Sequence, residues 1–200
     1  MTLCAVYQQF LKEKISEGVT EHTLKYYKYN LPKFIEWCVD NRIENVEDVY
    51  DHLFEDYKLY LIKNKNGTKK ISLQTYTRAV KTFLLWLNEN ELLQNVGKLK
   101  LIKAEIANIV PLSDVEVKIL LNDFDNSYFD IRNKLMVMLM LDSGLRRGEV
   151  VSLESKNIFM YNNTMLVNGK GEKQRLVPFG EETKRYINRY FNNRKSFYFF

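Results

Sequence analysis

Two short motifs lie near the ends of residues 141–179, and they limit how this part of the chain can fold. The first, D-S-G-L-R-R-G-E-V over residues 142–150, follows a strongly apolar run that predicts a buried helix. Gly144 supplies a turn after that helix, because glycine adopts the backbone conformations that end helices. The second motif, over residues 167–178, places Gly169-Lys170-Gly171 between two segments of β-branched and apolar residues. This order predicts a helix, a turn, a second short helix and a β-hairpin.

The first hundred residues carry apolar side chains at helical spacing in four successive segments. We expect helices over residues 6–17, 20–38, 45–61 and 72–87. In the first segment Phe10 and Ile15 are expected on the same buried side. Thr20 is the predicted N-cap of the second helix, and the polar run over residues 64–70 is a predicted loop. A small helical bundle buries stripes of this kind.

The pattern changes near residue 110. Residues 95–109 form a predicted linker, since their alternating lysines favour a segment that lies on a surface. Ser113 and Glu116 then form a predicted capping box, which marks the start of a helix. We therefore expect a mainly α fold with a small antiparallel β-sheet. Its two parts are a helical domain over residues 1–94 and an α+β domain over residues 110–200.

The composition narrows the class of protein. Hydrophobic residues make up 46% of the chain, which supports a buried core, and the formal net charge of +5 permits a polyanionic partner without requiring one. Cys4 and Cys38 have no zinc-binding spacing, so we expect reduced thiols and no metal site. The longest apolar run, residues 135–141, is far shorter than the roughly 20 residues that span a bilayer. We expect a soluble, cytoplasmic protein that does not enter a membrane.

Together, the motifs and the order of helices resemble the tyrosine recombinases, also called the phage integrase family. In that family a G-L-R-x-x-E turn supplies an arginine for the scissile phosphate, and a hairpin supplies a lysine from a G-K-G-x-K-x-R segment. The resemblance implies a DNA-contacting core-binding domain followed by a truncated α+β catalytic domain. It assigns Arg146 as the first catalytic arginine, Lys170 as the lysine that protonates the leaving 5′ oxygen, and Glu149 as a supporting acid. It also implies double-stranded DNA as the partner, a homo-oligomer on DNA, and no metal or other cofactor.

The residue types suit that chemistry. Negative charge builds on the non-bridging phosphate oxygens during strand cleavage, and a guanidinium donates two parallel bonds to such oxygens. Glu149 follows Arg146 by three residues, on the same face of a helix, where it can orient the guanidinium. Each residue also has an ordinary structural interpretation: Arg146 as a surface arginine beside a helix turn, and Lys170 as a solvent-facing hairpin lysine.

Further DNA contacts are expected in both domains. Lys173 and Arg175 extend the basic strand and suit phosphate contacts, although a charged edge strand that prevents aggregation fits them equally well. In the first domain the expected contacts surround the start of the fourth helix: Lys69, Lys70, Thr75, Tyr76 and Arg78. Basic and hydroxyl side chains at a helix N-terminus suit phosphate contacts, and a solvated polar face is the alternative.

The family's later H-x-x-R motif and its tyrosine nucleophile have no match in this sequence, because no histidine follows His52. Tyr186 and Tyr190 fit the core side of a last helix over residues 181–194, and Tyr198 lies in an aromatic tail without the motif. We therefore expect a truncated chain that is inactive in strand cleavage by itself. Two alternatives stay open: a non-catalytic DNA-binding protein that competes for recombination sites, and an unrelated helical protein with a chance motif.

Overall fold

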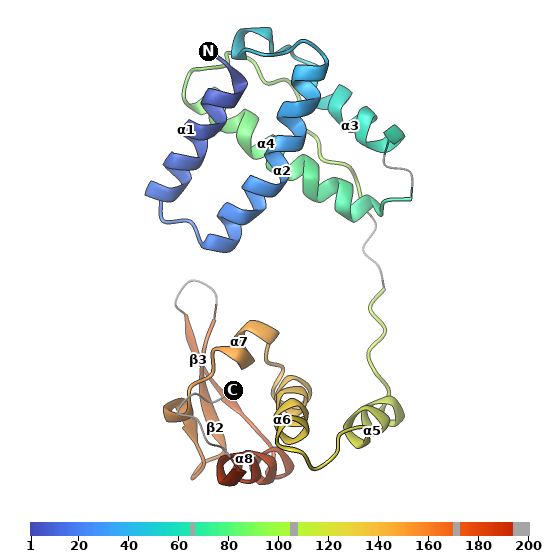
Figure 1. Cartoon of the computed structure of the whole chain (residues 1–200), viewed down its shortest axis with the longest axis vertical. Helices are drawn as coiled ribbons and strands as arrows, with labels where there is room; N and C mark the ends of the chain where they lie inside the picture. The colour runs from blue at the N-terminus through green and yellow to red at the C-terminus, as the bar shows by residue number, and fades with distance from the viewer. Residues whose placement is uncertain (65–66, 105–107, 170–172, 194–200) are drawn as a thin grey trace. The chain divides into compact units, whose positions relative to one another are not determined.

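The computed structural model describes residues 1–64, 67–104, 108–169 and 173–193. The chain divides into two compact units, Met1–Asn108 and Ile109–Phe200 (Figure 1). The first unit is helical, and the second combines helices with one small antiparallel sheet, so the predicted fold class is confirmed. None of the described helices is long and apolar enough to cross a membrane.

The described part of the first unit contains four α-helices. They are α1 (Leu3–Ser16), α2 (Glu21–Asp40), α3 (Leu53–Asn64) and α4 (Lys70–Glu89), with a 3-10 turn at Val46–Asp48. α4 packs against each of the other three helices. The predicted cap of α2 is present, since the Thr23 amide donates to Thr20 Oγ1 over 3.3 Å. Pro32 lies inside α2, which runs through it to Asp40.

Aromatic side chains fill the core of the first unit. The fully buried rings include Phe10, Phe34, Phe54, Tyr57 and Phe83. Phe10 meets Phe83 edge to face with ring centroids 5.4 Å apart, and Phe34 meets Tyr57 in the same way at 5.0 Å. Burial of such rings is the main stabilising term for a unit of this size. The expectation for Ile15 was wrong: it is 56% exposed, because five residues after Phe10 a helix has turned about 140° away.

Residues 95–102 pack along α3 and α4. Lys58 Nζ donates to the carbonyl oxygen of Lys100 over 2.9 Å, and Gln74 Nε2 donates to that of Ile102 over 2.9 Å. The first part of the predicted linker is therefore held on the first unit by side chains of its helices. The predicted domain limits, residues 94 and 110, stay predictions.

At Gly97 the backbone of this segment runs close to the backbone of Asp51. The φ of Gly97 is +58°, and a Cβ there would lie 2.6 Å from the carbonyl oxygen of Asp51. The Asn95 side chain donates to Asp51 Oδ2 over 3.1 Å, just before this glycine. Only glycine fits both the backbone conformation and the space at position 97.

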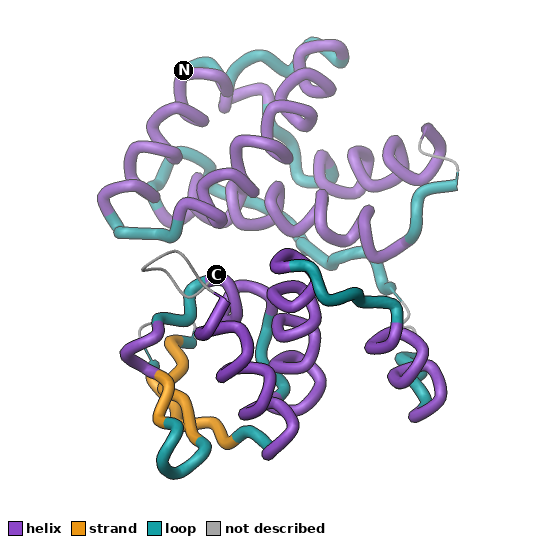
Figure 2. The backbone as a smooth tube through the Cα atoms, turned by 60° about the horizontal axis from the view of Figure 1, so that its bottom comes forward, coloured by secondary structure: helices purple, strands orange, loops and turns teal. Residues whose placement is uncertain are grey.

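The second unit begins with α5 (Asp114–Asn122), α6 (Tyr128–Ser143) and the short α7 (Arg147–Val151), and it continues with β1 (Ile158–Phe159), β2 (Thr164–Asn168), β3 (Gln174–Pro178) and α8 (Glu181–Asn193). The strands pair antiparallel in the order β1-β2-β3 (Figure 2). The predicted hairpin is thus confirmed as β2 and β3, in a register that places Val167 opposite Arg175. α8 packs against α6.

Local capping signals in the second unit are confirmed. The Ser113 backbone N–H donates to Glu116 Oε2 over 2.8 Å, and the Glu116 amide donates to Ser113 Oγ over 3.3 Å. The core that follows is built from α6, α8 and one face of the sheet, with Leu139, Met165 and Ile187 fully buried.

The run that forms α6 was expected to be buried on all sides, and this expectation was wrong. Its buried residues are Ile131, Leu135, Met138 and Leu139. Leu141, by contrast, is 42% exposed, because it borders an open pocket beside α5.

Candidate functional site

The turn between α6 and α7 presents Arg146 to solvent. Gly144 ends α6 in the left-handed conformation, with φ +63°, and the next residue, Leu145, is buried and anchors the turn. Arg146 then occupies the N-cap position of α7, and its side chain is 79% exposed. A buried leucine thus fixes the backbone directly before an exposed guanidinium.

The carboxylate of Glu149 accepts hydrogen bonds from both Arg146 and Arg175. Its side chain is only 7% exposed. The Arg146 backbone N–H donates to Oε2 over 2.8 Å, and Arg146 Nη1 donates to Oε1 over 3.0 Å. Arg175 of β3 donates from Nη1 to Oε1 over 2.8 Å and from Nη2 to Oε2 over 2.9 Å. We call Arg146, Glu149 and Arg175 the arginine cluster.

These contacts keep Glu149 ionised. The hydrogen bonds from Arg175, followed by that from the Arg146 backbone, lower the pKa of Glu149 from its ordinary value to about 2, against the opposing effect of burial. The same pairing raises the pKa of Arg175. Two guanidiniums share one carboxylate, so one positive charge in the cluster is left uncompensated at neutral pH. That charge is available to an anion.

The β2–β3 hairpin begins beside the cluster. The Gly169 amide donates to the carbonyl oxygen of Lys173 over 2.7 Å, which extends the pairing of β2 and β3 toward the hairpin tip. A Cβ at Gly169 would lie 3.6 Å from Arg175 Nη1, so the base of the hairpin passes close to the guanidinium. Lys173 is exposed. Lys170, the predicted catalytic lysine, lies outside the described residues, as does Tyr198.

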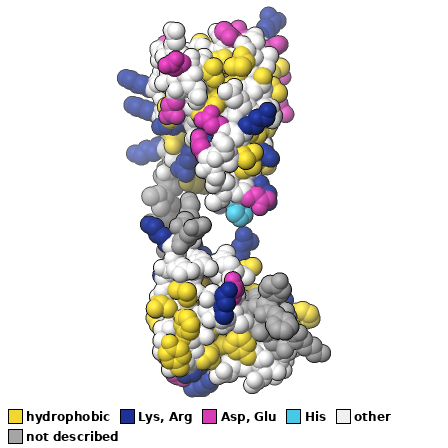
Figure 3. Space-filling view, turned by 90° about the vertical axis from the view of Figure 1, so that its left-hand side faces the viewer, with side chains coloured by type: hydrophobic (Ala, Val, Ile, Leu, Met, Phe, Trp, Pro, Cys, Tyr) yellow, Lys and Arg dark blue, Asp and Glu magenta, His cyan; other side chains and the backbone are white. Residues whose placement is uncertain are grey.

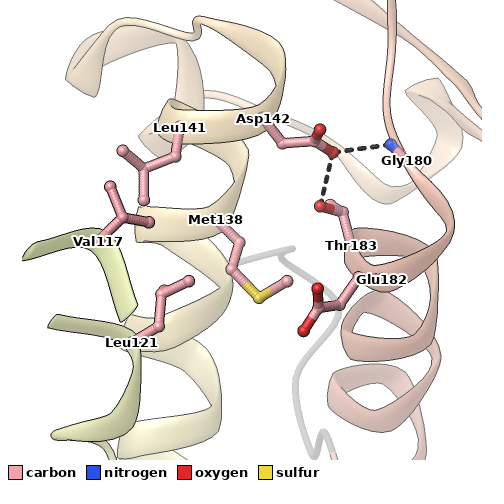
Figure 4. A pocket seen from close by; sticks show the side chains of 8 residues that line it. All are labelled: Val117, Leu121, Met138, Leu141, Asp142, Gly180, Glu182 and Thr183. Atoms are coloured by element: carbon pink, nitrogen blue, oxygen red, sulfur yellow. Dashed lines mark hydrogen bonds between the residues drawn. The ribbon is translucent and has the colours of Figure 1, made fainter. Parts of the chain in front are cut away.

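Asp142, in the same sequence motif, has a structural role that the sequence did not indicate. Its Oδ2 accepts the Gly180 amide and the Thr183 hydroxyl, both over 2.7 Å, and so joins the end of α6 to the start of α8 (Figure 4). The carboxylate borders a pocket of about 240 Å³ whose other lining residues include Val117 and Met138. With two donors already on one oxygen, Asp142 serves to hold the helices together.

The predicted contacts of the first unit lie at the start and in the first half of α4. Lys69, Lys70, Thr75 and Arg78 are exposed, and Tyr76 is half-buried. We call these five residues the α4 surface. In the space-filling view, Lys and Arg side chains gather along one edge of this unit (Figure 3).

Two residues of the α4 surface have contacts within the unit. The Thr75 hydroxyl donates to the carbonyl oxygen of Ile71, and the Thr75 carbonyl accepts the Tyr26 hydroxyl over 2.8 Å. Lys33 Nζ lies 5.2 Å from the centre of the Tyr76 ring. These contacts show that Thr75 and Tyr76 help to join α4 to α2, in addition to any contact with a ligand.

The described residues contain no group of three or more His, Cys, Asp or Glu side chains that could hold a metal ion. In the arginine cluster, two guanidiniums surround the carboxylate of Glu149. Such an arrangement suits recognition of a phosphate rather than of a cation.

Comparison with known proteins agrees with the motifs. Residues 111–199 match the model of the phage integrase family. The curated relatives include tyrosine recombinase XerD of Vibrio cholerae, 28% identical over 193 residues that cover 94% of this chain and 63% of the relative. They also include XerA of Saccharolobus solfataricus, 26% identical over 198 residues that cover 96% and 65%. The chain therefore spans less than two thirds of the length of these relatives.

Solved recombinase structures share the fold. The Tn1549 transposon integrase in complex with transposon right end DNA has a TM-score of 0.72 at 18% identity, over 98% of this chain and 66% of that one. The XerH site-specific recombinase bound to a palindromic difH substrate has a TM-score of 0.68 at 18% identity, over 96% and 60%. The family-model match over residues 111–199, the curated relatives and the shared fold make this chain similar to the tyrosine recombinases, or phage integrases.

Proposed function

We propose that this chain binds duplex DNA as part of a site-specific recombinase, with Arg146 of the arginine cluster on a backbone phosphate. The observation that carries the proposal is the pair of guanidiniums held by the buried carboxylate of Glu149. Arg146 uses one side-chain N–H on that carboxylate, and a guanidinium has five. Its exposed side chain therefore keeps donors for a phosphate, where a charge-assisted bond is strongest.

Lys170 completes the proposed site by its position in the sequence motif. We assign to it the protonation of a leaving 5′ oxygen, for which an ammonium group is the appropriate acid. Lys173 is proposed to contact a neighbouring phosphate. In the first unit, the α4 surface is proposed to contact further phosphates, with the amides at the start of α4 as additional donors.

Duplex affinity measured against salt concentration tests the proposal. We expect the logarithm of the association constant to fall linearly with the logarithm of salt concentration, since phosphate contacts release counterions. Arg146→Gln should lower the slope by about 0.9, the value for one phosphate contact. Arg185→Gln on α8 removes an equal charge from another exposed position and is the matched control. Equal slopes for both variants, or no binding of duplex at low salt, would contradict the proposal.

Strand cleavage is a separate question, because a second arginine in H-x-x-R and the following tyrosine have no match in this sequence. We propose that the chain by itself binds DNA without cutting it and therefore competes with active recombinases for their sites. A nicked duplex that traps covalent protein–DNA complexes tests this, and a denaturant-resistant complex would overturn it.

We also propose that the chain assembles as a homo-oligomer on DNA. Sedimentation of the protein with and without duplex checks this.

A further inference from the structure

We infer that Arg175 is a positioning residue: it fixes the β2–β3 hairpin to the start of α7 through Glu149 and does not itself bind a phosphate. The inference deepens the proposed function and rests on it for its consequence in DNA binding. It differs from the sequence expectation, in which Arg175 extends a basic strand toward phosphates.

The two arginines use the shared carboxylate differently. Arg175 faces Glu149 with two parallel bonds, one to each oxygen, at 2.8 and 2.9 Å. Arg146 makes one side-chain bond, at 3.0 Å. The Arg175 side chain is 41% exposed, about half the exposure of Arg146. Two N–H groups of Arg175 are therefore occupied by Glu149, whereas Arg146 keeps side-chain N–H groups that can donate to a ligand.

The surroundings of Arg175 explain why it is held. It pairs with Val167 across the sheet, and two residues later Val177 is buried, so Arg175 stands on the core-facing side of β3. At that place the guanidinium reaches the carboxylate of α7, and its Nη1 would lie 3.6 Å from a Cβ at Gly169. Arg175 thus lies between the sheet, the hairpin base and α7.

The Glu149–Arg175 ion pair couples the position of the Arg146 turn to that of the β2–β3 hairpin. Glu149 is fixed to the Arg146 turn through the Arg146 backbone N–H, and 26 residues later Arg175 is fixed to the hairpin through the strand register. From Arg175 the ladder continues to the bond between Gly169 and Lys173. Loss of Arg175 therefore frees the hairpin base from α7, although it leaves Arg146 bound to Glu149.

Two variants separate this role from a phosphate contact. Arg175→Gln removes the charge, and Arg175→Lys keeps it but cannot make two parallel bonds to a carboxylate. In the absence of DNA, we expect both variants to speed hydrogen exchange at the Gly169 amide by roughly tenfold, as expected when a charged hydrogen bond is lost. Exchange at the Ile187 amide, in the core of the same unit, should change by a smaller factor and shows that the fold persists.

Duplex binding supplies the second measurement. Both Arg175 variants should weaken binding by a similar factor at every salt concentration and leave the salt slope unchanged, whereas Arg146→Gln lowers the slope by about 0.9. The inference is overturned if Arg175→Gln lowers the slope as Arg146→Gln does, if Arg175→Lys restores normal binding, or if Gly169 exchange does not change. If the unmodified protein binds no duplex, the proposed function fails, and the exchange measurement still decides the positioning role.

Discussion

The α4 surface and the arginine cluster are both basic, but their charges are held in different ways. Lys69, directly before α4, and Arg78, on α4, make no ion pair with any residue that the structure describes, and the helix is held by the aromatic core beneath it. In the arginine cluster, the charges themselves are fixed by Glu149. The first arrangement attracts a polyanion over a broad area, and the second presents a guanidinium in one place. The α4 surface carries three cationic side chains and the arginine cluster one uncompensated positive charge, so the first suits steering and the second orientation.

The largest expected effect comes from the core beneath the α4 surface. Phe83→Ala removes a fully buried ring from α4 and should lower the free energy of unfolding of the first unit by roughly 3–5 kcal/mol. Both tryptophans, Trp37 and Trp86, lie in this unit, so the fluorescence of tryptophan during denaturation reports on it. Hydrogen exchange at Ile187 follows the second unit, where no change is expected. Equal destabilisation of both units would break the comparison, since it would make the cluster depend on the aromatic core.

A smaller effect is expected when the carboxylate of the cluster is neutralised. Glu149→Gln should lower the stability of the second unit by roughly 1–3 kcal/mol. This is less than for a fully buried ion pair, because both arginines reach solvent. Hydrogen exchange at Ile187 measures the effect, and unchanged tryptophan fluorescence is the internal control. A stability equal to that of the unmodified protein would mean that Glu149 does not hold the cluster together.

Single charges on the α4 surface should matter less than Glu149. Arg78→Gln is expected to weaken duplex binding by a few-fold, equally for all sequences, and to reduce the salt slope by about 0.9. Unlike Glu149→Gln, it should leave the stability of both units unchanged, since Arg78 is exposed. Lys12→Gln on α1 is the charge-matched control. A change in sequence preference, in place of uniform weakening, would assign base contacts to α4.

The last prediction concerns the pH dependence of stability. The pKa of Glu149 is lowered in the folded state to about 2 from an ordinary value of 4.5. The stabilisation from its ionised form is therefore fully present above about pH 4.5 and is lost as the pH falls toward 2. Between pH 5 and 8 the cluster should contribute no pH dependence to the stability of the second unit. Hydrogen exchange at Ile187, measured at several acid pH values, should show a weaker acid dependence in Glu149→Gln, and an identical dependence would contradict the pairing.

Features set by neighbours in the sequence were predictable. Thr20 and Ser113 cap helices because their hydroxyls lie next to the amides they accept from. The G-K-G segment separates two strands that pair with each other, as expected for a hairpin. Arg146 and Glu149, three residues apart, were expected to meet and do so.

Features set by distant residues were not predictable. The bonds from Arg175 to Glu149 join residues 26 apart, and those from Gly180 and Thr183 to Asp142 join residues about 40 apart. Composition and periodicity carry no information about which carboxylate a distant donor will reach. Arg175 was therefore interpreted from its basic neighbours alone, as a phosphate contact or as a charged residue of an edge strand.

The bond between Glu149 and Arg175 also sets an order of events during synthesis. A growing chain that has left the ribosome as far as Glu149 already contains the Arg146 turn, but not the strand that carries Arg175. The local pair can form at once, whereas the second pair must wait for translation of β3 and for closure of the loop between them. The helical unit, translated earlier and built from its own core, has no such delay. The arginine cluster is thus completed late, after the part of the chain that is proposed to meet DNA through α4 has folded.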